Sequence, residues 1–172
     1  MVLQRRARPL LGTLVEIGWD GPGHAGADAF DAIAHLQRTL SRFEADSEIA
    51  RFNRLKAGES LRVAAPTAHV LGAAALLTQA TGGVFDITLG CGARAWRLQH
   101  GILHKLERGL QLDLGGIAKG YAVDQALAVL GLLEHLAATV QYKMIVRSNK
   151  ANNNSKWSAE LFSIQLSPFV PT

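Results

Sequence analysis

The stretch LDLGGIAKGYAVDQ, residues 112–125, predicts a short strand, a tight turn and a helix. An apolar run leads into Gly115 and Gly116, which can adopt backbone angles closed to other residues and can let a ligand lie against the main chain. The helix that follows would direct unpaired N–H groups at the same point, and such a corner favours anions. An ordinary strand-to-helix connection is the alternative explanation of this pattern.

Two polar residues flank the predicted corner. Lys119 is expected in the first helical turn, where its amine can reach a bound phosphate, and Asp113 is expected at the end of the strand. The glycine spacing matches neither the Walker loop nor the dinucleotide-binding Rossmann turn. Apolar residues at helical spacing support the helix; they are Ala118, Ala122, Val123, Ala126, Leu127 and Leu130.

The composition is typical of one globular domain, with 172 residues, of which 48% are hydrophobic and 19% charged. The net charge of +4 is mild and the basic residues are scattered, which favours small anionic ligands over nucleic acid. A single cysteine, Cys91, excludes an internal disulfide framework and a cysteine-rich metal site. We expect no signal peptide and no membrane span, because no apolar stretch approaches about 20 residues, and we therefore expect the chain in the cytoplasm.

Hydrophobic periodicity predicts the main elements before residue 81. Apolar and polar residues alternate over 10–19, which predicts an opening strand. Asp46 or Ser47 is the expected N-cap of a short helix that follows it in the chain. The predicted helices span residues 25–43, 48–55 and 66–80.

The region between the third predicted helix and the glycine pair is less regular. Residues 84–90 are predicted as an extended run, and residues 97–108 as a polar, irregular segment. His100 and His104 lie four residues apart, as in some helical metal sites, but no third ligand accompanies them. The sequence therefore does not predict a zinc site here.

Four segments, taken in chain order, resemble the FAD:protein FMN transferases, the ApbE family of flavin-trafficking proteins. DLGGIAKGYAVD at 113–124 looks like the signature of that family. GGVFDITLG at 82–90 is similar to a second family segment nearly position by position. LGT at 11–13 and LSRFEADSEIARFN at 40–53 resemble two more. The chain departs from the family at Leu11, where Met is usual, at Phe43, where Tyr is frequent, and at CGAR, residues 91–94, where the family continues with PLV.

The resemblance implies an α+β fold, a partial ApbE-like domain related to the T-fold. It also implies that FMN passes from FAD to a Ser or Thr hydroxyl of a target protein, with release of AMP and with Mg²⁺ as the metal. The main-chain carbonyl of Gly116 would be one metal ligand, and the catalytic residues stay unknown. Relatives often act in the periplasm or at the inner membrane. The residues that the resemblance assigns to FAD binding are Leu11, Phe43, Val84, Phe85, Asp86, Asp113 and Lys119.

The composition changes near residue 132. All 17 glycines lie within residues 1–131, whereas four of the five asparagines lie at 149–154. We interpret 1–131 as the N-terminal part of an ApbE-like domain and 132–172 as a tail of unrelated composition, as in a truncated or frameshifted chain. The later carboxylate metal ligands of the family have no counterpart, so transfer by this chain alone is expected to be impaired. A non-catalytic flavin-binding module and an inactive gene fragment are the alternatives.

Overall fold

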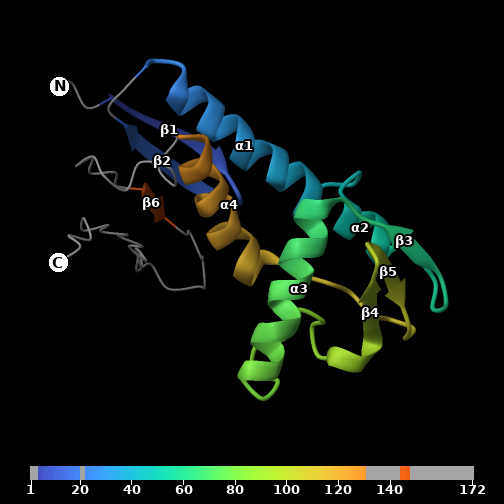
Figure 1. The fold of residues 1–172 in the computed structure, drawn as a ribbon. Helices are drawn as coiled ribbons and strands as arrows, with labels where there is room; N and C mark the ends of the chain where they lie inside the picture. The colour runs from blue at the N-terminus through green and yellow to red at the C-terminus, as the bar shows by residue number, and fades with distance from the viewer. Residues whose placement is uncertain (1–3, 20–21, 131–143, 148–172) are drawn as a thin grey trace, which may run out of the picture. The chain divides into compact units, whose positions relative to one another are not determined.

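The computed structural model describes residues 4–19, 22–130 and 144–147 (Figure 1). The chain divides into two compact units, one made of Met1–Ala34 with Ala122–Thr172 and the other of His35–Tyr121. Helices α1 (Ala25–Leu40) and α4 (Gly115–Val129) each contribute residues to both units. The first unit is built on one antiparallel sheet and the second on another, and with the helices they confirm the predicted α+β fold.

The sheet of the first unit is a hairpin with a third strand beside it. Strand β1 (Gln4–Leu10) pairs with β2 (Thr13–Trp19), and β6 (Met144–Arg147) pairs with the other edge of β2. Leu11 and Gly12 form the turn with φ values of 56° and 67°. Positive φ at both residues suits the twist of a two-residue hairpin. The prediction of one strand over 10–19 was therefore wrong, because the hairpin turn at Leu11 and Gly12 lies inside that range. Strand β1 was missed because apolar and polar residues hardly alternate along it.

The core of the first unit lies on one face of β2. Val15, Ile17 and Trp19 alternate along the strand and are buried, as the period of two predicts. The indole Nε1 of Trp19 donates to the Pro22 carbonyl at 3.1 Å. The ring itself occupies the space beside Gly26 in the first turn of α1, where a Cβ atom would overlap it. Gly26 is thus required by packing.

The second unit contains the sheet β3-β5-β4, which is antiparallel throughout. The β4–β5 turn consists of His100 and Gly101, with φ values of 50° and 74°. The prediction of an irregular segment over 97–108 was wrong, since the inward-facing residues of β5 are one leucine and one buried lysine, and the lysine hides the alternation. Apart from its parts of α1 and α4, the second unit contains α2 (Glu48–Asn53), β3 (Ser60–Arg62), α3 (Ala65–Ala80), the 3-10 turn η1 (Ala93–Ala95), β4 (Trp96–Gln99) and β5 (Ile102–Lys105).

The helices were predicted well, apart from their ends. Helix α1 ends at Leu40, so Phe43 lies outside it. Helix α2 has Ser47 as its N-cap, with the Ala50 N–H donating to Ser47 Oγ at 2.9 Å. In α3, Pro66 occupies the first turn, as expected for a residue without an N–H. None of the helices in the described ranges is long and apolar enough to cross a bilayer.

Residues 84–90 are a series of turns and not the predicted extended run. The Asp86 carboxylate folds this loop: its Oδ1 accepts from the backbone N–H of Thr88 at 2.8 Å and from the Thr88 hydroxyl at 2.6 Å. Its Oδ2 accepts from the Gly90 N–H at 3.2 Å. Aspartate commonly stabilises turns through such contacts with the backbone that follows it.

The Trp19–Gly26 contact gives a test of the packing of the first unit. We expect Gly26→Ala to lower the free energy of unfolding by about 1–3 kcal/mol, because the new methyl group overlaps a buried ring. Urea unfolding measures the change. The matched control is Gly72→Ala in α3, where a Cβ meets nothing within 4 Å and should raise stability by about 0.5–1 kcal/mol. Equal effects of the two substitutions would contradict the packing described.

Candidate functional site

The predicted anion-binding corner is the start of α4. The Leu114 carbonyl accepts from the N–H groups of Ile117 at 3.0 Å and Ala118 at 2.8 Å, and the Gly115 N–H donates to Asp113 Oδ1 at 2.9 Å. The Gly116 N–H finds no acceptor in the part of the chain that the structure describes. The corner therefore offers one free backbone donor to a ligand. Because α4 begins at Gly115, Lys119 lies in its second turn and not, as predicted, in the first.

The two glycines are not needed for unusual backbone angles, since neither has a positive φ. A Cβ on Gly116 would lie 3.4 Å from Cε2 of Phe85, which is an ordinary contact, and both glycines are exposed. Alanine is preferred over glycine within helices by roughly 0.5–1 kcal/mol. The fold alone thus gives no reason for glycine at 116, and the space beside the Phe85 ring is left for a close approach.

The segment before the corner is held by a side chain and not by a strand. Asn53 Nδ2 donates to the Leu112 carbonyl at 3.0 Å, and the Leu112 N–H donates to Asn53 Oδ1 at 2.8 Å. The Asp113 N–H donates to the Ile87 carbonyl at 2.8 Å. The predicted strand at 112 is therefore wrong, because an amide side chain supplies the two hydrogen bonds that a neighbouring strand would make.

Asn53 is itself fixed by a buried cation. Lys105 Nζ donates to the Asn53 carbonyl at 2.9 Å, and Gln111 Nε2 donates to the same oxygen at 3.2 Å. The lysine is only 3% exposed. Asn53 ends helix α2, where a cation is favoured by the helix dipole. Burial lowers the pKa of Lys105, although the nearby Cys91 and Glu59 act to raise it.

Phe43 lies in the loop between α1 and α2, outside the helix although the prediction of a helix over 25–43 included it, and is 81% exposed. The guanidinium carbon of Arg42 lies 4.7 Å from the centroid of the Phe43 ring. The Nε of Arg42 lies 3.3 Å from Asp113 Oδ2. Asp113 thereby connects Phe43, through Arg42, to the Gly115 N–H.

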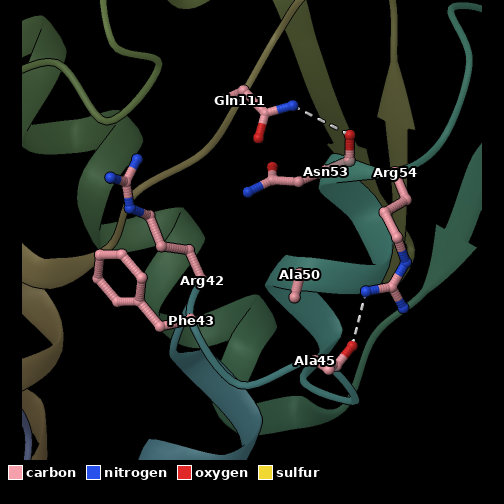
Figure 2. A pocket seen from close by; sticks show the side chains of 7 residues that line it. All are labelled: Arg42, Phe43, Ala45, Ala50, Asn53, Arg54 and Gln111. Carbon is pink, nitrogen blue, oxygen red and sulfur yellow. Dashed lines mark hydrogen bonds between the residues drawn. The ribbon is translucent and has the colours of Figure 1, made fainter.

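A cleft of about 300 Å³ adjoins this group (Figure 2). Its volume is at the lower end of the range of ligand pockets, which suits one planar ring system better than a whole dinucleotide. The lining carries two arginines and no carboxylate, so an electron-rich or anionic ligand is favoured. The lining residues are Arg42, Phe43, Ala45, Ala50, Asn53, Arg54 and Gln111.

The other residues assigned by resemblance are placed differently. Asp86 spends both carboxylate oxygens inside its own loop; partial burial acts to raise its pKa, but the hydrogen bonds from Thr88, Gly90 and Gly92 outweigh this and lower the pKa. Val84 is 89% exposed. Leu11 belongs to the first unit, at a positive φ in its hairpin turn.

Sequence reasoning gave no role to Arg42, Asn53, Gln111 or Lys105. Asn53 was detectable as the only asparagine before residue 149. Lys105 would have stood out as an inward position once residues 102–105 were recognised as a strand. Arg42 and Gln111 carry no signal in the sequence, since an arginine or glutamine in a loop is ordinarily solvated.

The described residues do not supply a magnesium site. Within residues 4–19, 22–130 and 144–147, no group of three or more His, Cys, Asp or Glu side chains could hold a metal ion. The one carboxylate at the corner, Asp113, is paired with Arg42 and accepts from the Gly115 N–H. Mg²⁺ prefers several oxygen ligands in octahedral geometry, and the Gly116 carbonyl alone does not meet this requirement.

Comparison with known proteins gives one family. The model of the ApbE family matches residues 11–103 and 97–161. The apo flavinyl transferase ApbE of Pseudomonas stutzeri is 24% identical, with a TM-score of 0.72 over 84% of this chain and 54% of that chain. The flavin transferase ApbE of Vibrio cholerae is 20% identical, with a TM-score of 0.70 over 85% and 57%.

A third solved structure agrees with these two. The ApbE protein of Thermotoga maritima is 19% identical, with a TM-score of 0.71 over 84% of this chain and 59% of that chain. No curated protein matches the chain. At these identities the structures establish the fold, and the chain spans little more than half the length of each of them.

The buried amine gives a pH-dependent test of how the site is held. The folded chain has a lowered Lys105 pKa, so between that value and the ordinary value of 10.5 the unfolded chain binds more protons. We therefore expect the stability of the wild type, relative to Lys105→Met, to rise as the pH approaches 10.5. Urea unfolding of both proteins between pH 7 and 10.5 measures the difference. A difference that is constant with pH, or that falls, would contradict the burial of a charged amine.

Proposed function

Since the chain belongs to the ApbE family, we propose that it binds FAD and takes part in Mg²⁺-dependent transfer of FMN from FAD to a Ser or Thr of a target protein. The observation that carries this proposal is the start of α4, where the Gly116 N–H has no acceptor among the described residues and where the packing around the glycine does not require it. A pyrophosphate is the ligand that this geometry favours, because helix N-termini attract anions and the absent Cβ allows close contact.

Different residues of the second unit would contact different parts of FAD. Phe43 is an exposed aromatic ring at the cleft and would stack on the isoalloxazine ring. The Gly116 N–H would hold the pyrophosphate, with Gly115 and Asp113 beside it and the Lys119 amine one turn further along α4. Val84, Phe85 and Asp86 would border the flavin nucleotide, Asp86 chiefly by keeping the loop folded.

The proposed reaction is a phosphoryl transfer. The oxygen of the target hydroxyl forms a bond to the phosphorus of the FMN half, the pyrophosphate P–O bond breaks, AMP leaves with those electrons, and the hydroxyl proton is released. Such reactions depend on positioning and on neutralising charge at the phosphates. The side chains described here can bind and orient FAD. They do not include the carboxylates that Mg²⁺ requires, so they do not account for neutralising the charge of the phosphates by a metal ion.

The lack of metal-binding carboxylates among the described residues favours a second function. A chain that positions FAD without holding Mg²⁺ would be a flavin-binding module without transfer activity. The pairing of Asp113 with Arg42 supports this alternative, because Asp113 is the one carboxylate that the described residues place at the corner. We therefore propose that transfer by this chain alone is impaired, while FAD binding is retained.

Incubation with FAD, Mg²⁺ and a target protein separates binding from transfer. We expect the chain to bind FAD in a fluorescence titration and to leave the target without a fluorescent flavin band in a denaturing gel. A full-length ApbE transferase in the same assay is the positive control for the target. Strong labelling by this chain would contradict the impaired activity, and failure to bind FAD would contradict the proposed function as a whole.

Two glycine variants in α4 test where FAD lies. Gly116→Ala fits the fold but fills the space kept beside Phe85, so we expect weaker FAD binding without loss of stability. Gly120→Ala is the matched control in the same helix, since a Cβ there meets nothing within 4 Å. FAD binding should be unchanged in that variant. Equal binding by both variants would place the pyrophosphate elsewhere.

A further inference from the structure

We propose that Arg42 is a positioning residue, which holds the Phe43 ring for stacking and ties its orientation to Asp113 at the start of α4. This inference rests on the proposed binding of FAD. It extends that function by connecting the flavin-stacking aromatic to the pyrophosphate corner through a single side chain.

The geometry supports a position behind the ring. The guanidinium carbon of Arg42 lies 4.7 Å from the ring centroid, as in a cation–π contact. Phe43 nevertheless stays 81% exposed, so much of the ring is open to a ligand while Arg42 contacts it. Figure 2 shows the two side chains close together beside the cleft. A flavin stacked on the open part would give the order flavin, Phe43, Arg42.

The ion pair fixes the arginine in turn. Its Nε lies 3.3 Å from Asp113 Oδ2, while Asp113 Oδ1 accepts from the Gly115 N–H at 2.9 Å. The Asp113 carboxylate therefore contacts both the backbone at the start of α4 and the arginine that lies against the Phe43 ring. Any shift of Asp113 on binding phosphate would be transmitted to Arg42.

The loop that carries both residues is well anchored at its ends. The Phe43 N–H donates to Ser41 Oγ at 3.2 Å, and the Ser47 hydroxyl donates to the Ser41 carbonyl. Gln37 Nε2 donates to Glu44 Oε1 at 3.0 Å. With the backbone held in this way, the side chain of Arg42 is the element that decides how the Phe43 ring is turned.

The second arginine of the cleft does not have this role. Arg54 Nη1 donates to the Ala45 carbonyl at 2.7 Å and supports the loop backbone. Arg42, in contrast, makes no hydrogen bond through its terminal nitrogens within the described ranges. Direct binding of a phosphate by those nitrogens is the alternative role, and it would not depend on Phe43.

The test is a double-mutant cycle on ligand binding by the full chain. FAD and riboflavin are titrated into the wild type, Arg42→Met, Phe43→Ala and the double variant. We expect Arg42→Met to lower the affinity for both ligands by about two- to tenfold and to reduce the fluorescence quenching of bound riboflavin. In the Phe43→Ala background, the same substitution should have no further effect, because the arginine acts through the ring.

Arg51→Met is the control for charge, since Arg51 is exposed on α2 and the same charge is removed away from the cleft. An Arg42→Met effect that persists without Phe43, or that affects FAD and not riboflavin, would show direct phosphate binding and overturn the proposal. Wild-type binding of FAD with no change in Arg42→Met would also overturn it. Absence of binding by the wild type would instead refute the proposed function, and this inference with it.

Discussion

The two hydrogen bonds between the Asn53 side chain and the backbone of Leu112 are the constraint on which the candidate site depends. They join positions 59 residues apart, at distances of 2.8 Å and 3.0 Å. Leu110, Leu112 and Leu114 are buried while Gln111 is exposed, so one side of this segment packs in the core of its unit although the segment is not part of a strand. Each bond is worth about 1 kcal/mol net, but an unpaired buried backbone group costs about 1–3 kcal/mol. The asparagine therefore allows the chain to reach the start of α4 in one conformation.

Two charged residues, Lys105 and Asp113, lie next to the Asn53–Leu112 contact. The buried Lys105 holds the carbonyl of Asn53 from one side, and Asp113 follows Leu112 on the other. Asp113 then accepts from the Gly115 N–H and forms an ion pair with Arg42. This pairing explains why the corner can favour an anion while the Asp113 carboxylate is not free to bind a metal. Binding of FAD and metal-assisted transfer thus make different demands, and the described residues lack the cluster of metal ligands that the transfer requires.

Periodicity and capping predicted the helices, because apolar spacing and residues such as Ser47 and Pro66 act locally. Family motifs predicted the Gly115–Gly116 corner, and the family match confirms that resemblance. The sequence failed where a side chain replaces backbone pairing. Asn53 substitutes for a strand at Leu112, and Asp86 folds a segment that was expected to be extended.

The remaining differences also have local causes. The hairpin turns at Leu11 and His100 require positive φ at residues other than glycine, which a pattern of apolar residues does not reveal. Phe43 was included in the predicted helix because it continues the apolar spacing, whereas α1 ends at Leu40. The residue pairs that build the site, Arg42 with Asp113 and Lys105 with Asn53, join distant positions, and neither propensity nor motif spacing contains that information.

The most direct measurement is an NMR titration of the ¹⁵N-labelled chain with FAD, with amide hydrogen exchange recorded before and after. The structure predicts that the amides of Gly115, Gly116 and Phe43 shift most, and that the Leu112 and Asp113 amides exchange slowly in both states because Asn53 and Ile87 hold them. Shifts confined to other residues, or a Leu112 amide that exchanges as fast as that of the exposed Arg108, would contradict the account.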